Sequence, residues 1–140
     1  MPPAISEEVA AAFDAFPAAA RLRLLDVRRL IFETAERTAG VGPLTEALRW
    51  GEPAYLTEAS GSGSTIRLGT TRLGLSKQRA GQGAILFNCR TTLIETFRTH
   101  FPHAFAYQGA RAILLTPNGP LPEAPLAICL AMALTYHRLK

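Results

Sequence analysis

Cysteine is scarce in this chain, which argues against a disulfide-rich scaffold and against a cysteine-based metal centre. The 140 residues include two cysteines, Cys89 and Cys129, which stand far apart and lack the spacing of metal ligands. The two cysteines could form one disulfide. However, Glu7 and Glu8 stand where a signal peptide carries positive charge, so export is not expected. Two reduced thiols in a cytoplasmic protein are therefore the favoured interpretation.

Long hydrophobic runs and the common catalytic motifs are also missing. The longest apolar run, residues 124–134, is too short to span a bilayer, so it indicates a core helix and no membrane association is expected. There is no glycine-rich nucleotide loop, nucleophile elbow or HExxH motif. His100 and His103 flank a proline without a third ligand nearby, which favours a helix end over a metal site. No metal or cofactor is predicted.

Cys89 is the one candidate for an enzymatic role. It precedes Arg90 and an expected helix N-terminus, a setting that can make a thiol reactive. No general base accompanies it in sequence, so a structural thiol is favoured. The sequence predicts no catalytic residue, and a non-enzymatic protein is the favoured interpretation.

What the chain does have is an apolar composition and an uneven distribution of charge. Hydrophobic residues make up 48% and charged residues 19%, which indicates one folded domain over residues 1–140. Within a net charge of +4, residues 59–122 hold seven basic side chains against the single acid Glu95. The seven are Arg67, Arg72, Lys77, Arg79, Arg90, Arg98 and Arg111. Clustered arginine suits an anion-binding surface, whereas the mixed charge of the first half argues against nucleic acid.

Hydrophobic periodicity predicts helices first, then strands with one helix inserted, then a hairpin and a closing helix. Ser6 caps a helix that ends near Phe16, and a second helix runs from Pro17 to about Thr38. Strands are expected at 54–57, 65–68, 72–76, 84–87, 105–107 and 111–115, and further helices from Thr92 and from Pro125. The fold class is α+β, with a mainly antiparallel sheet of five to six strands and the N- and C-terminal helices packed on one face.

The segment around the single tryptophan is the most distinctive part of the chain. Pro43 can open a short helix that Gly51 ends in a left-handed cap, and Pro53 then favours an extended chain from Ala54. This predicts a helix-to-strand junction with Trp50 and Tyr55 close together.

Alternation along the strands assigns the candidate binding residues to one face of the sheet. In the first three strands one alternate set is apolar and should face the helices. The opposite set holds Tyr55, Arg67 and Arg72, and Arg111 joins it if the last hairpin follows the same pattern. Such a face is either a solvated surface or a site whose guanidinium groups bind a carboxylate or phosphate. The solvated surface is favoured, because antiparallel sheets usually expose one face to water.

The junction also carries a family resemblance. In Glu46, Trp50, Gly51, Pro53 and Tyr55 the chain resembles the YdhG-like family of bacterial domains of unknown function, and weaker similarity continues through residues 91–101, 107–111 and 133–137. The resemblance implies a compact domain with helices packed on an antiparallel sheet. One branch of that family is described as frataxin-like, delivering iron for iron–sulfur cluster assembly.

Two functional hypotheses follow. The first is a cytoplasmic binding module that holds a small or anionic ligand on the open sheet face. Its residues are Trp50, Tyr55, Arg67, Arg72 and Arg111, with Tyr107 at the rim. The alternative is a frataxin-like iron chaperone that uses Glu7, Glu8 and Asp14. A homodimer is compatible with either hypothesis.

Overall fold

The described residues form one six-stranded antiparallel sheet with helices on one of its faces. The computed structural model of the chain describes residues 2–70, 82–116 and 118–138. The strand order is β1-β2-β3-β4-β6-β5, so β4 is central, as predicted for residues 84–87. The strands are β1 (Thr45–Arg49), β2 (Glu52–Leu56), β3 (Ile66–Thr70), β4 (Gly83–Leu86), β5 (Ala106–Gln108) and β6 (Ala112–Leu114).

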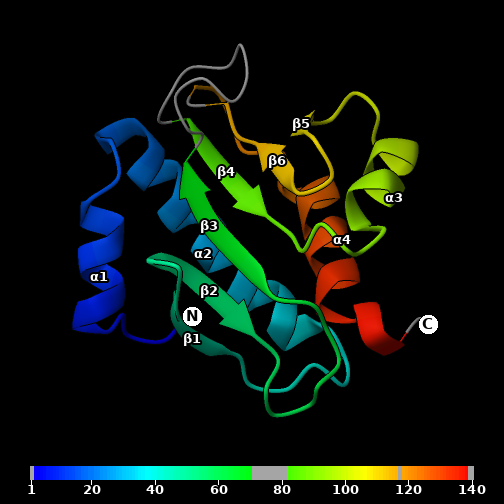
Figure 1. The fold of residues 1–140 in the computed structure, drawn as a ribbon, viewed down its shortest axis with the longest axis horizontal. Coiled ribbons are helices and arrows are strands. Elements are labelled where there is room, and N and C mark those ends of the chain that lie inside the picture. Colours follow the sequence, from blue (N-terminus) through cyan, green and yellow to red (C-terminus); the bar gives the residue numbers. More distant parts are fainter. Residues whose placement is uncertain (1, 71–81, 117, 139–140) are drawn as a thin grey trace.

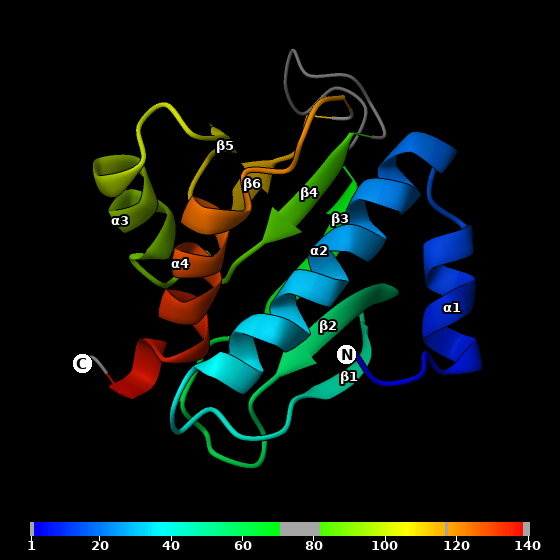
Figure 2. The same cartoon turned by 180° about the vertical axis from the view of Figure 1, so that it is seen from behind.

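The helices lie behind this sheet and at its sides. They are α1 (Glu7–Asp14), α2 (Ala18–Arg37), α3 (Leu93–His100), α4 (Glu123–Leu134) and the short 3-10 helix η1 (Tyr136–Arg138). α2 and α4 cross one face of the sheet, and α1 packs beside α2 next to β1 and β2 (Figure 2). None of these helices covers the opposite face (Figure 1). The predicted α+β class, with terminal helices on one face, is confirmed.

The core fills the space between the helices and the sheet. The predicted stripe on α2, Leu24, Val27 and Ile31, is fully buried, and Ile85 of the central strand is buried against it. Each such side chain contributes roughly 1.5–3 kcal/mol to the free energy of unfolding. None of the described helices is both long and apolar enough to cross a membrane.

The prediction of a short helix before Trp50 was wrong. Residues 45–56 form a β-hairpin in which Arg49 pairs with Glu52, leaving Trp50 and Gly51 as a two-residue turn. Both turn residues have positive φ, 51° at Trp50 and 76° at Gly51, which is the pattern of a type I′ turn. Gly51 does use its left-handed freedom, but it does so inside a hairpin.

The loop between β2 and β3 holds the start of β3 against the end of α4. The Ser62 hydroxyl donates to the Leu134 carbonyl at 2.7 Å, and the Ser64 N–H donates to Ala133 at 2.9 Å. A Cβ at Gly63 would lie 2.4 Å from the Leu134 oxygen, so the close approach requires glycine. These contacts fix the chain that enters β3.

Two further expectations have outcomes here. The predicted strand at 72–76 lies outside the described residues. α3 begins after Thr92 as expected, although the Thr92 side chain makes no cap hydrogen bond. The Thr92 N–H instead donates to the Tyr136 hydroxyl at 3.3 Å.

Candidate functional site

The strand register places Arg67 on the open face and Tyr55 on the helix face. Residues directly opposite one another in an antiparallel pair share a face. Arg67 lies opposite Ala54 and Leu86, whereas Tyr55 lies opposite the buried core residue Ile66. The prediction that Tyr55 faces the arginines was therefore wrong.

Tyr55 is instead fully buried between β2 and α2. Its hydroxyl donates to the Glu46 carboxylate at 2.8 Å, and its ring meets Phe32 edge to face at 5.7 Å. Burial, and next the adjacent Glu46 charge, raise the pKa of the Tyr55 phenol, so the hydroxyl stays protonated. Glu46 in turn binds Arg28 of α2.

Tyr107 also lies on the helix face and not at the rim of the open face. It pairs with buried Ile113 across β5 and β6. Its hydroxyl reaches the carbonyl oxygens of Phe101 at 2.8 Å and Phe97 at 3.1 Å, and burial raises its pKa. Tyr107 therefore closes the end of α3 and does not line the candidate site. Arg72, another predicted site residue, lies outside the described residues.

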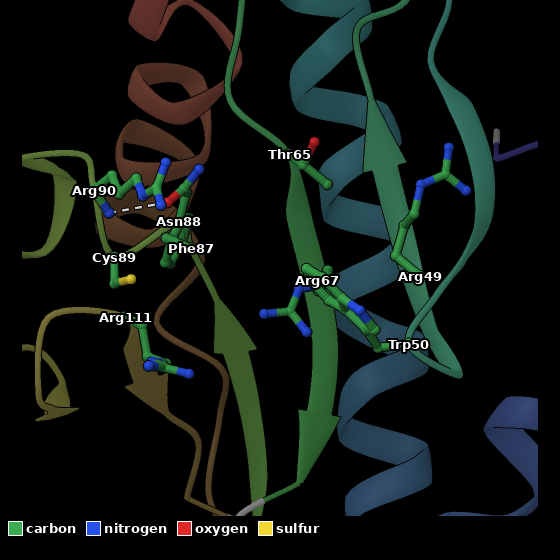
Figure 3. Close-up of a pocket in the computed structure, with 9 residues that line it drawn as sticks. All are labelled: Arg49, Trp50, Thr65, Arg67, Phe87, Asn88, Cys89, Arg90 and Arg111. Atoms are coloured by element: carbon green, nitrogen blue, oxygen red, sulfur yellow. Dashed lines mark hydrogen bonds between the residues drawn. The ribbon is translucent and has the colours of Figure 1, made fainter.

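Three of the predicted residues do come together. A cleft of about 460 Å³ on the open face is lined by residues from the β1–β2 turn, β3, the loop after β4 and the turn before β6. The lining residues are Arg49, Trp50, Thr65, Arg67, Phe87, Asn88, Cys89, Arg90 and Arg111 (Figure 3). Trp50, Arg67 and Arg111 were predicted, while Arg49 and Arg90 were not among the predicted site residues.

Trp50 and Arg67 form one wall of the cleft. The guanidinium carbon of Arg67 lies 4.9 Å from the centre of the Trp50 ring, within the range of a cation–π contact. Arg67 also forms an ion pair with Glu52, so its orientation is held from two sides. The Trp50 side chain itself is 87% exposed.

Arg111 and Arg90 approach from the other side. The Phe87 N–H donates to the Arg111 carbonyl at 2.6 Å, which joins the end of β4 to the start of β6. The Arg90 N–H donates to the Asn88 side chain at 2.9 Å. In Figure 3 the Arg67 and Arg111 side chains point toward one another, Arg90 lies on the side of Arg111, and Arg49 points away from the three.

The cleft carries excess positive charge. Glu52 balances Arg67, but within the described part of the chain no hydrogen bond or ion pair engages the guanidinium groups of Arg90 and Arg111. Like charges this close repel one another, and an anion between them would relieve that repulsion. The arrangement is suited to hold a carboxylate or phosphate.

The two arginines that the sequence prediction missed had weak signals. Arg49 was assigned to the expected helix before Gly51. A glycine at position 51 also fits a hairpin turn, which is the structure that forms. Arg90 lies in the loop after the central strand, where strand alternation predicts nothing. Its position in the loop that follows an apolar strand was the available signal, because loops at strand ends often carry binding residues.

The two cysteines differ sharply. Cys89 is exposed and lines the cleft, whereas Cys129 is buried in α4, and burial raises the pKa of its thiol to about 12. No disulfide joins them. The described residues contain no group of three or more His, Cys, Asp or Glu side chains arranged to hold a metal ion.

No family model, curated protein or solved structure matches the chain.

Proposed function

We propose that the protein binds a small anionic ligand in the cleft on its open sheet face. The observation that carries this proposal is the placement of Arg67, Arg90 and Arg111 around one hollow, from three segments distant in sequence. Guanidinium groups bind carboxylate and phosphate through paired hydrogen bonds, and Arg90 and Arg111 keep that capacity available.

The shape of the cleft supports a small molecule. A volume of about 460 Å³ lies within the range of roughly 300–1,000 Å³ that small-molecule sites occupy. The Trp50 ring adds an apolar wall beside the arginines, and Phe87 also lines the cleft.

Binding without catalysis fits the lining residues best. Among the described residues that line the cleft there is no carboxylate or imidazole to transfer protons at neutral pH. The exposed Cys89 thiol fits a reducing compartment such as the cytoplasm.

The alternative, iron delivery by a frataxin-like protein, has no observation in its favour. The acids Glu7 and Glu8 lie in the first turn of α1, where they complement the helix dipole. The metal-ligand groups that such a role needs are missing from the described residues. We also propose that the chain is a member of the YdhG-like family. This membership favours neither anion binding nor iron delivery.

Titration calorimetry with inorganic pyrophosphate tests the proposal. We expect pyrophosphate to bind. Arg111→Ala and Arg90→Ala should each weaken binding by about ten- to hundredfold, because each removes a charge-assisted hydrogen bond of roughly 1.5–3 kcal/mol. Raising the salt concentration should weaken binding further.

Arg37→Ala is the matched control. Arg37 is an exposed arginine in the last turn of α2, away from the cleft, so its removal changes the net charge equally. If Arg37→Ala weakens binding as much as Arg111→Ala, binding reflects net charge and the cleft is not the site. The proposal also fails if wild-type protein binds no pyrophosphate.

A further inference from the structure

Trp50 has properties that anion binding alone does not explain. It is the most exposed of the large hydrophobic residues in the described chain, at 87%, compared with 70% for Leu22. It also has φ of 51°, and it is the single non-glycine residue with positive φ in the described ranges. A type I′ turn favours asparagine, aspartate or glycine at this position. Backbone geometry therefore works against tryptophan here, and so does solvent exposure of its ring.

The ring is nevertheless held in a defined orientation. Arg67 lies over it at 4.9 Å, and Glu52 pairs with Arg67. Glu52 and Trp50 belong to the same hairpin, and Arg67 belongs to the neighbouring strand β3. A side chain fixed in this way and open to solvent is a prepared stacking surface, since little ordering remains when a ring docks on it.

The ring and the free arginines share one cleft. Trp50 lies on the β1–β2 side, whereas Arg90 and Arg111 lie on the β4–β6 side (Figure 3). A bare phosphate contacts the arginines without filling a cleft of about 460 Å³. A ligand with a ring at one end and an anionic group at the other would use both sides.

We propose that the ligand is a nucleotide-like anion, a planar heteroaromatic ring joined to a phosphate, whose ring stacks on Trp50 while Arg90 and Arg111 bind the phosphate. This proposal rests on the anion-binding function proposed above. Bases stack on aromatic side chains, and arginine contributes a cation–π interaction to such sites.

A free nucleotide and a single-stranded nucleic acid both supply a base next to a phosphate. The structure favours the free nucleotide, because one tryptophan supplies a surface for one base. Strand-binding sites instead follow the backbone with a longer charged groove and several aromatic residues.

Titration calorimetry with three matched probes tests this inference. Adenosine monophosphate carries both the ring and the phosphate, ribose 5-phosphate lacks the ring, and adenosine lacks the phosphate. We expect the monophosphate to bind wild-type protein at least tenfold more tightly than either of the others, since stacking and charge both contribute.

Trp50→Asn is the informative variant. Asparagine tolerates the left-handed turn before glycine, so the hairpin is retained while the ring is removed. We expect this variant to bind the monophosphate and ribose 5-phosphate equally, with ribose 5-phosphate affinity unchanged from wild type. Trp50→Phe, which keeps an aromatic ring, should restore part of the difference, and Arg37→Ala should behave as wild type.

The outcomes separate this inference from the anion-binding proposal. Equal wild-type affinity for monophosphate and ribose 5-phosphate, both weakened by Arg111→Ala, overturns the stacking role and leaves anion binding intact. No binding of any phosphate overturns both proposals. A decathymidylate that binds much more tightly than the monophosphate, with Trp50→Asn weakening it, overturns the small-molecule assignment.

Discussion

Each face of the β1–β2 hairpin presents a glutamate that pairs with an arginine of another element, and the two pairs have opposite surroundings. On the helix side Arg28 binds Glu46, with side-chain exposures of 8% and 10%. On the open side Arg67 binds Glu52, with exposures of 20% and 25%. Each arginine also lies over an aromatic ring, Arg28 over Phe32 at 5.0 Å and Arg67 over Trp50 at 4.9 Å.

The helix-side pair is saturated. Arg28 donates to the two Glu46 oxygens at 2.5 and 2.9 Å and to the Pro3 carbonyl at 2.8 Å, and Glu46 also accepts from Tyr55. These bonds join α2, β1, β2 and the N-terminal segment. A network so fully occupied has no capacity for a ligand, so its role is structural.

The open-side pair belongs to an unsaturated group. Arg67 is balanced by Glu52, but the neighbouring Arg90 and Arg111 add charge that no described carboxylate pairs with. The same residue types therefore stabilise the fold where all of them are paired and buried. They form a candidate binding site where positive charge remains unpaired in a cleft.

Glu46→Gln breaks the saturated network and should have the largest effect on stability. It leaves the Arg28 charge buried without its counter-ion, which typically costs roughly 3–5 kcal/mol in the free energy of unfolding. Urea denaturation at pH 7 measures this loss.

Glu52→Gln is the matched variant on the open face. Water reaches both Arg67 and Glu52, so we expect a cost of about 1 kcal/mol or less. The contrast between the two sides is wrong if Glu52→Gln destabilises the protein as much as Glu46→Gln does.

Tyr55→Phe should have an intermediate effect that depends on pH. Removing the hydroxyl deletes a hydrogen bond to a carboxylate, worth about 1.5–3 kcal/mol at neutral pH. Because burial raises the folded-state pKa above about 10, the unfolded chain loses the phenol proton first as pH rises. The stabilisation is thus complete below about pH 10 and is lost above it.

Unfolding free energies of Tyr55→Phe and wild type between pH 7 and 11 test this expectation. The variant should show a shallower decline above about pH 10. Part of the decline should persist, because Cys129, with its pKa raised to about 12, also loses stabilisation in alkali. Parallel curves for the two proteins would mean that Tyr55 titrates no differently in the folded state.

Much of the fold could be predicted because local signals agreed with tertiary packing. The Ser6 side chain accepts from the Val9 N–H at 3.3 Å, as its position before Glu7 and Glu8 indicated. The 3.6-residue spacing of Leu24, Val27 and Ile31 marks the buried stripe of α2 directly, because one face of a helix can be read from spacing alone.

The site was harder to predict because alternation does not say which face of a strand is buried. In β2 both Ala54 and Tyr55 are fully buried, so burial does not alternate there. The prediction placed Tyr55 on the face away from the helices. In the structure Tyr55 instead pairs with Glu46 across the β1–β2 hairpin, and a helix over residues 43–50 would not allow this pairing. Tryptophan at the first turn position hid the hairpin, since sequence rules expect asparagine or glycine there.

Trp50→Asn should have the smallest effect on the free energy of unfolding. Whether that free energy rises or falls tests the contrast between the helix side and the open side of the sheet. A non-glycine residue in the left-handed region costs roughly 1–2 kcal/mol, of which asparagine recovers part. Loss of the cation–π contact with Arg67 offsets about 0.5–1 kcal/mol at an exposed position. The free energy of unfolding should therefore stay the same or rise by a few tenths of a kcal/mol. A loss well above 1 kcal/mol in urea denaturation would make Trp50 a structural counterpart of Tyr55. A neutral or stabilising result would mean that folding does not account for tryptophan at this position, as the proposed stacking role of the ring requires.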